Sequence, residues 1–317
     1  MINHSELNPI VSIIVPILNE EEHLLGLLES ISMQTYRPIE VKFVDGGSTD
    51  KTRTLLNNYI EAFSDPSLLL TLIFEEKFCG NKGPAHARNI GIKSAVGEFF
   101  ILLDADTQFI DQDSVSKLKK LLDLYDFIRV KTIVKPDTDL EKKISITSPN
   151  YCHCGYRKWV FDNILFDEQL VYGEDRDLWF RIEKDLDVSP YTSEEILLVR
   201  HLPHSLKDYF KQSIWYAKSY TQFVNSVLEK GNMAYLDEIV NTFLGFLLCC
   251  YLPLFFITSF FKDFKQNKKI DFHFFSINFM RRCLFLFHLW KSSFNIQSLK
   301  VYVNCMALRL INTIDKF

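Results

Sequence analysis

The sequence of 317 residues lacks the cysteine pattern of a disulfide-built protein. Its seven cysteines are odd in number and irregularly spaced, which argues against a disulfide scaffold in a chain of this length. The segment Cys152-His153-Cys154 resembles a fragment of a metal site, but no second Cys/His pair lies near it in the sequence. We therefore do not expect a zinc site there. The sequence also contains no internal repeat and no low-complexity segment.

A strong charge imbalance and an apolar N-terminal segment are missing as well. The formal net charge of -4 gives no reason to expect nucleic acid as a partner. Residues Met1 to Pro9 are polar and contain no signal-peptide core, so we expect the catalytic part in the cytoplasm. By contrast, a hydrophobic fraction of 47% with 28 Phe is high for a purely soluble protein.

The first 135 residues alternate short apolar runs with helical patterns, which is typical of repeated β-α units. Asn19 stands three residues before Glu22, a spacing that predicts a capping box at the start of the first helix. Because helical crossovers of this length join parallel strands, we expect an α/β fold with a mostly parallel sheet flanked by helices. The predicted strands are Val11–Leu18, Ile39–Val44, Leu68–Phe74 and Glu98–Leu103.

Two carboxylates, Asp104 and Asp106, follow the last of these apolar runs directly. The run from Phe99 to Leu103 predicts a strand that is buried on both faces. Open α/β sheets bind ligands outside the carboxyl ends of their strands, which is where these aspartates should lie. Hard oxygen ligands suit Mg²⁺ or Mn²⁺, which in turn would hold the phosphates of a nucleotide.

Two further loops admit both a functional and a structural interpretation. The loop Asp45 to Asp50 has glycines that allow a sharp turn, and an acidic side chain there can accept hydrogen bonds from a base or ribose. Equally, it is an ordinary β-α turn with Asp50 capping the helix. In the segment Asn81 to Asn89, Lys82 and Arg88 lie near a helix N-terminus, where phosphate binds well. Arg88 suits either a diphosphate or a structural carboxylate.

The segment Gly173 to Arg181 predicts a helix that opens with adjacent acidic residues. Its carboxylates either complement the helix dipole or act on an acceptor. In the functional interpretation, Asp175 removes a proton from an acceptor hydroxyl, while Glu174 braces it or contacts the acceptor. His201, which follows the strand-like run Ile196 to Val199, is either a structural histidine or a third metal ligand.

Five motifs of the sequence read V-S-I-I-V-P-I-L-N-E, D-G-G-S-T-D, A-R-N-I-G-I-K-S-A-V-G-E, L-D-A-D and G-E-D-R-D-L. They occur in the order and spacing of family 2 glycosyltransferases, which the chain resembles over roughly residues 9 to 215. This resemblance implies the Rossmann-like GT-A fold, a nucleotide-sugar donor, a divalent metal such as Mn²⁺ or Mg²⁺, and inversion at the anomeric carbon.

The resemblance also assigns roles to single residues. It implies that Pro16 and Glu20 line the nucleotide pocket and that Asp45 contacts the base. It implies further that Asp104 and Asp106 face the ribose and the metal-diphosphate, with Asp106 the more direct ligand. Asp175 resembles the catalytic base, and His201 resembles a downstream metal-binding histidine. The predicted donor-binding set is Pro16, Glu20, Asp45, Lys82, Arg88 and Asp104.

Two positions depart from the family pattern. Gly46 stands where the family loop commonly has a second acidic residue, so one nucleotide contact is missing or replaced. Gln212 to Tyr216 resembles the Q-x-x-R-W motif of processive synthases but has Trp215 in the place of arginine, which favours single addition. A sugar nucleotidyltransferase would carry a glycine- and arginine-rich loop after its first strand, and Ile17-Leu18-Asn19-Glu20 is not such a loop.

The segment Ile239 to Phe261 contains no charged residue and is long enough to cross about 30 Å of hydrocarbon as a helix. Lysines follow it, and positive residues prefer the cytosolic side of a membrane. The predicted donor site, which precedes the segment, also belongs on the cytosolic side, and a helix that crosses once cannot have both of its ends there. Pro253, near the middle of the segment, therefore favours a re-entrant or interfacial segment over a clean crossing. A transferase held at the cytosolic membrane face would meet a lipid-linked acceptor.

The predicted organisation is a GT-A domain over residues 1–215, followed by a helical membrane-associated region over residues 216–317. The predicted function is an inverting, metal-dependent glycosyltransferase that acts on a hydroxyl or phosphate of a lipid-linked or saccharide acceptor. The alternative is a catalytically silent, membrane-bound scaffold that binds nucleotide sugars.

Overall fold

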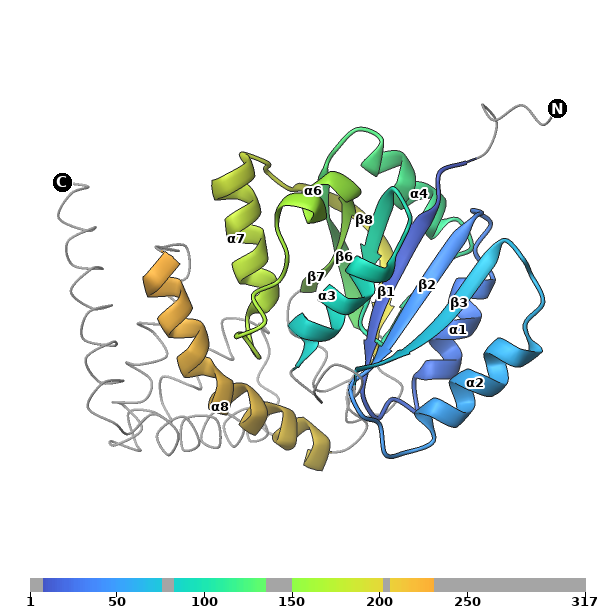
Figure 1. Cartoon of the computed structure of the whole chain (residues 1–317), viewed down its shortest axis with the longest axis horizontal. Helices are drawn as coiled ribbons and strands as arrows, with labels where there is room; N and C mark the ends of the chain where they lie inside the picture. Colours follow the sequence, from blue (N-terminus) through green and yellow to red (C-terminus); the bar gives the residue numbers. More distant parts are fainter. Residues whose placement is uncertain (1–7, 76–82, 135–149, 202–205, 231–317) are drawn as a thin grey trace, which may run out of the picture. The chain divides into compact units, whose positions relative to one another are not determined.

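The computed structural model of the protein describes residues 8–75, 83–134, 150–201 and 206–230. They form an eight-stranded mixed sheet with the strand order β3-β2-β1-β4-β7-β6-β8-β5 (Figure 1). The strands are β1 (Val11–Ile17), β2 (Ile39–Asp45), β3 (Leu68–Phe74), β4 (Phe99–Leu102), β5 (Thr107–Phe109), β6 (Phe127–Val134), β7 (Asn150–Arg157) and β8 (Tyr191–Arg200).

Helices cover both faces of the sheet. These helices are α1 (Leu24–Ser32), α2 (Thr52–Ala62), α3 (Pro84–Ser94), α4 (Ser114–Leu122), α6 (Lys158–Asn163) and α7 (Glu174–Leu186). A further helix, α8 (Leu206–Lys230), follows them in the chain and belongs to a separate compact unit. Apolar side chains of α1, α2 and α4 pack in one core with one face of the sheet, and those of α3, α6 and α7 pack in a second core. Strand β4 contributes Ile101 to the first core and its neighbour Phe100 to the second. This confirms the prediction that β4 is buried on both faces.

The four predicted β-α strands are parallel, as expected. Strand β1 pairs in parallel with β2 on one side and with β4 on the other, and β2 pairs in parallel with β3. Beyond β4 the sheet becomes mixed, because β7 inserts antiparallel between β4 and β6. The carboxyl ends of β1, β2 and β4 therefore meet at one edge, as the site prediction required.

The predicted capping box at Asn19 is wrong. Helix α1 begins at Leu24, and its N-cap residue, His23, makes no side-chain cap hydrogen bond. Asn19 instead has a positive φ of 57°, and its Oδ1 accepts a hydrogen bond of 2.8 Å from the Thr49 backbone N–H. The side chain that would have capped the helix is thus used to tie the β1–α1 loop to the β2–α2 loop.

The chain divides into two compact units. The first comprises Met1–Lys135, Ser148–Glu168 and Glu174–Leu202, and it contains the sheet. The second comprises Pro136–Thr147, Gln169–Gly173 and Pro203–Phe317. Within it, Tyr172 packs against Tyr220 and Phe223 of α8, with ring centroids 5.9 Å and 5.6 Å apart. The domain boundary after residue 215 stays a prediction.

Within the described part of the chain, no helix is both long enough and apolar enough to cross a membrane. The segment for which we predicted membrane contact, Ile239 to Phe261, lies outside the described residues.

Candidate active site

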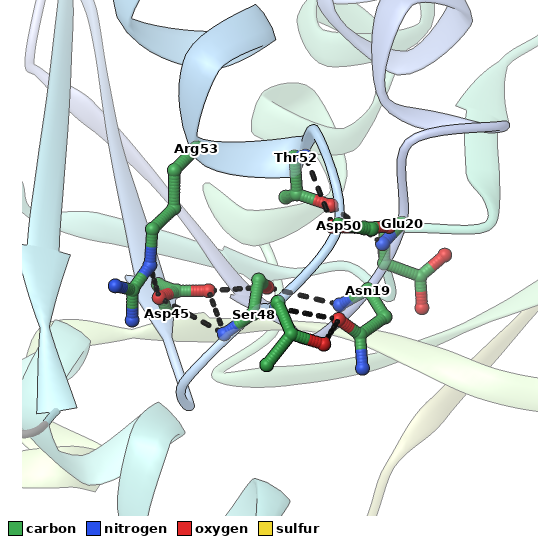
Figure 2. A network of polar contacts seen from close by, with 8 residues as sticks. Asn19, Glu20, Asp45, Ser48, Asp50, Thr52 and Arg53 are labelled. Atoms are coloured by element: carbon green, nitrogen blue, oxygen red, sulfur yellow. Dashed lines mark hydrogen bonds and ion pairs between the residues drawn. The ribbon is translucent and has the colours of Figure 1, made fainter.

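The loops after β1 and β2 are joined by a network of hydrogen bonds at the carboxyl edge of the sheet (Figure 2). The Ser48 hydroxyl accepts from the Asn19 backbone N–H at 2.9 Å, and the Thr52 hydroxyl accepts from the Glu20 backbone N–H at 2.8 Å. Asp50 accepts from the backbone N–H groups of Thr52 and Glu21 at 3.0 Å and 3.2 Å. Asp50 therefore contacts the first residue of α2, but the N-cap residue of this helix is Lys51, not Asp50 as the structural interpretation predicted.

Asp45 lies at the end of β2 and is fully buried. Its carboxylate accepts a hydrogen bond of 3.1 Å from the Ser48 backbone N–H and forms an ion pair with Arg53 (Figure 2). These contacts are enough to explain an acidic residue at this position, because Asp45 stabilises the turn between β2 and α2. The base contact predicted for Asp45 stays a prediction, as does the lining role of Pro16, which lies beside Val44 in the β1–β2 register.

Asp104 and Asp106 follow β4, and each is paired with an arginine. Arg88 of α3 donates from Nη2 to Asp104 Oδ1 at 2.8 Å. Arg200, the last residue of β8, donates from Nε to Asp106 Oδ2 at 2.9 Å, and its Nη2 lies 3.9 Å from Asp104 Oδ2. The two carboxylates are partly exposed, with 26% and 20% of their side-chain surfaces accessible, and so they can meet a ligand.

Glu20 lies in the field of these two aspartates. Burial raises the pKa of Glu20 to about 8, the charges of Asp106 and Asp104 add to the increase, and the charge of Arg200 opposes it. Burial is the largest cause of this increase, and the negative charges of the two aspartates come second. A hard divalent cation would offset these negative charges, and carboxylate oxygens are its preferred ligands. The residues present therefore fit such a cation, with Asp104 and Asp106 to hold it.

The acidic start of α7 is connected through Arg88 to the D-x-D segment, which is Asp104-Ala105-Asp106. Besides its bond to Asp104, Arg88 donates from Nη1 to Glu174 Oε1 at 2.7 Å. Burial on its own would lower the pKa of Arg88, but the charges of Asp104 and Glu174 raise it, so this guanidinium stays charged. Arg88 thus pairs with two carboxylates of the candidate site, and the donor contact predicted for it stays a prediction.

Glu174 and Asp175 differ in their surroundings. Glu174 is buried, and burial raises its pKa, while the adjacent Arg88 charge acts against this and the Asp175 charge adds to it. Asp175 is partly exposed, and its Oδ1 accepts a hydrogen bond of 2.8 Å from the Arg176 backbone N–H. Asp175 is therefore the more accessible of the two carboxylates for a proton transfer.

His201 lies beside the D-x-D segment. Its backbone N–H donates to the Asp106 carbonyl at 2.8 Å, and its ring stacks on His23 with centroids 5.6 Å apart. In the described part of the chain, the His, Cys, Asp and Glu side chains form no group of three placed to hold a metal ion. The metal set of Asp104, Asp106 and His201 stays a prediction. Lys82 lies outside the described residues.

Arg200 and His23 are the residues of this region that the sequence analysis missed. Arg200 is the last residue of β8, and Asp104 likewise follows the end of β4. A search for charged residues at the carboxyl ends of strands would therefore have identified Arg200 as well. The contact between His23 and His201 joins residues far apart in the sequence, and no local pattern marks it.

A search of solved structures shows which class of fold this is. The chain is similar to a mannosyltransferase from Pyrobaculum calidifontis, solved in complex with GDP-Man and Mn²⁺, with a TM-score of 0.56 and 22% sequence identity. The match covers 71% of this chain and 65% of the other. Together with the mixed α/β sheet, this likeness assigns the described residues to the GT-A-like class.

Sequence comparisons then identify the family. The profile of the family described as "Glycosyl transferase family 2" matches residues 12–169. The chain is 30% identical over 214 residues to an uncharacterized glycosyltransferase of Rickettsia typhi, and 38% identical over 109 residues to one of Haemophilus influenzae. These alignments cover 60% and 34% of this chain. The chain belongs to the family 2 glycosyltransferases. It spans 63% and 40% of the lengths of these two relatives.

Proposed function

We propose that this protein transfers a sugar from a nucleotide-sugar donor to an acceptor, with inversion at the anomeric carbon and Asp175 as the base. The observation that carries the proposal is the pair of hydrogen bonds that Arg88 makes to Asp104 and Glu174. This single side chain joins the candidate donor carboxylate to the helix start that bears the candidate base. An inverting transfer needs the donor and the base to lie side by side.

The proposed chemistry is a single displacement. The acceptor hydroxyl has a high pKa, so a carboxylate must take its proton as the new glycosidic bond forms. Asp175 is the partly exposed candidate for this role, and buried Glu174, tied to Arg88, orients the start of α7. The leaving nucleoside diphosphate gains negative charge, which a divalent cation held by Asp104 and Asp106 would stabilise when bound.

A divalent cation is part of the proposal because of the carboxylates around Glu20 and because the Pyrobaculum mannosyltransferase was solved with Mn²⁺. We further propose that Asp45, Pro16 and Glu20 line the nucleotide site, since β1 lies between β2 and β4 and the carboxyl ends of all three parallel strands lie at the edge that carries the D-x-D segment. Either Mn²⁺ or Mg²⁺ suits these oxygen ligands.

The first test replaces Asp175 by asparagine. Asp175→Asn keeps the shape of the side chain but removes the base, so the rate of sugar transfer should fall by about 10²–10⁴-fold. Donor affinity, measured by calorimetry, should stay within about twofold because the base contacts the acceptor. The matched control is Asp185→Asn, an exposed aspartate on the same helix, which should leave the rate unchanged.

Two outcomes would decide against this function. Unchanged turnover in Asp175→Asn would remove Asp175 from the role of base. A wild-type protein that binds a nucleotide sugar but transfers nothing to any acceptor would favour the alternative, a silent membrane-bound scaffold.

We propose a lipid-linked acceptor at the cytosolic membrane face, on the strength of the uncharged segment Ile239 to Phe261. Incubation of the full chain with radiolabelled donors and isolated membranes should give a product that partitions into organic solvent. Label that appears only in water-soluble saccharides would contradict the lipid-linked acceptor while leaving the transferase proposal intact.

A further inference from the structure

Arg200 forms a hydrogen bond to a carboxylate oxygen of Asp106 that a metal ion at the D-x-D segment would need as a ligand. Its Nε donates to Asp106 Oδ2 at 2.9 Å, and only 17% of the Arg200 side chain is exposed. The other oxygen of Asp106, Oδ1, accepts a hydrogen bond of 3.2 Å from the Thr107 hydroxyl. Both oxygens of Asp106 are therefore engaged, and a cation that binds there must compete with a guanidinium.

The backbone fixes the segment around Arg200 without help from this side chain. Arg200 is paired with Thr107 across β5 and β8 and with Val134 across β6 and β8. The His201 backbone N–H also donates to the Asp106 carbonyl at 2.8 Å. Because these main-chain contacts already hold the D-x-D loop against β8, the guanidinium is not required to position the loop.

We propose that Arg200 is a resident counter-ion that competes with a divalent cation for Asp106 and also binds the diphosphate of the donor. The inference rests on the proposed function and deepens it. A guanidinium matches a phosphate with two parallel hydrogen bonds as well as it matches a carboxylate. When a diphosphate is present, Arg200 has a second anion to bind and Asp106 is available to the cation. Metal alone then binds weakly, and metal with nucleotide binds tightly.

The test measures the binding of Mn²⁺ by calorimetry and needs no sugar transfer. Without nucleotide, Arg200→Gln should bind Mn²⁺ at least about fivefold more tightly than wild type, because a competing positive charge is gone. The matched control is Lys117→Gln, which removes a lysine paired with Glu195 on the same strand β8 and with Asp111. Its Mn²⁺ affinity should equal that of wild type. Adding Asp106→Asn to Arg200→Gln should abolish the gain, which assigns the measured site to Asp106.

The second measurement uses uridine and guanosine diphosphates in turn as probes. The nucleotide that binds should tighten Mn²⁺ binding to wild type by a larger factor than it does in Arg200→Gln, since the variant has no guanidinium to release. Equal or weaker Mn²⁺ binding in Arg200→Gln without nucleotide overturns the proposal.

If Arg200→Gln does not fold, as judged by circular dichroism, Arg200→Lys decides the question. One ammonium group cannot bind both aspartates as a guanidinium does, so Mn²⁺ should still bind more tightly than to wild type. Unchanged affinity in Arg200→Lys overturns the proposal. A protein that meets these metal-binding expectations but transfers no sugar leaves the inference standing and rejects the proposed function instead.

Discussion

Arg88 is the single residue on which the geometry of the candidate site depends most. Its guanidinium contacts the D-x-D segment and the start of α7 at once, and it also lies over the ring of Phe166, 5.4 Å from the centroid. A planar fork with donors on two edges can bridge two carboxylates in this way, and a lysine cannot. Arg88 therefore fixes the distance between two parts of the site that come from distant parts of the chain.

Replacing Arg88 by methionine should destabilise the protein strongly. Arg88→Met leaves Asp104 and buried Glu174 without their shared cation, and losing one partner of a buried ion pair costs about 3–5 kcal/mol. The free energy of unfolding, measured with urea, should fall by roughly this amount. The control is Lys119→Met, which breaks an i,i+4 pair with the more exposed Asp123 and should cost only about 0.5 kcal/mol. Equal losses in the two variants would contradict the bridging role.

The sequence predicted the candidate site residues better than it predicted their partners. Asp104 and Asp106 do lie at the carboxyl edge of the sheet, and Glu174 at the start of α7 is joined to Asp104 through Arg88. The ion pairs of Arg88 and Arg200 could not be predicted, since a charged side chain accepts many partners and the choice depends on tertiary packing. The partner of Asp45 could not be predicted either. An ion pair with Arg53 and a contact with a base both need an acidic residue at this position, so the sequence does not distinguish between them.

At the level of elements, the side chain of buried Glu40 joins β2 to β1 and to the segment that leads into β4. Its Oε1 accepts hydrogen bonds from the Ser12 hydroxyl of β1 and from the backbone N–H groups of Val96 and Gly97, just before β4. Burial acts to raise the pKa of Glu40, but these bonds and the one from Lys42 outweigh it and hold the pKa below its ordinary value of 4.5. The charged form is thus the one that fits the fold.

The stability of the protein should consequently fall in acid through Glu40. Because its pKa is lower in the folded chain, the contribution is present above pH 4.5 and is lost as the pH falls through the folded value. Glu40→Gln should cost about 1.5–3 kcal/mol of unfolding free energy at pH 7 and less at pH 3. Urea unfolding at both pH values tests this, with exposed Glu29→Gln as the control. An equal cost at both pH values would contradict it.

The elements up to β4 were predicted to within about two residues at most ends, because apolar periodicity and loop residues are local signals. The exception, α1, starts late because Asn19 bonds to another loop. The insertion of β7 between β4 and β6 was not predicted, since pairing between strands so far apart leaves no trace in the spacing of either one.

For the whole molecule, the clearest expectation is that the donor stabilises the fold. A ligand that binds only the folded state adds about 2.7 kcal/mol to the unfolding free energy at 100 times its dissociation constant. For a domain of this size the melting temperature should rise by about 2–4 °C per kcal/mol. We expect nucleotide sugars of one base to produce this shift with Mn²⁺ or Mg²⁺, and EDTA to reduce it. The corresponding free sugars serve as controls, and no shift with any nucleotide sugar would contradict the donor site.

The insertion of β7 has a consequence for how the chain is made. While the ribosome is still adding residues between Leu102 and Asn150, the strands β1 to β4 can already pair, but β4 keeps one row of backbone groups open. Nascent chains that pause in this interval expose an apolar strand edge that another copy can extend, a known route to aggregation. Protection of that edge arrives only with β7, so translation speed across this interval should influence the yield of soluble protein.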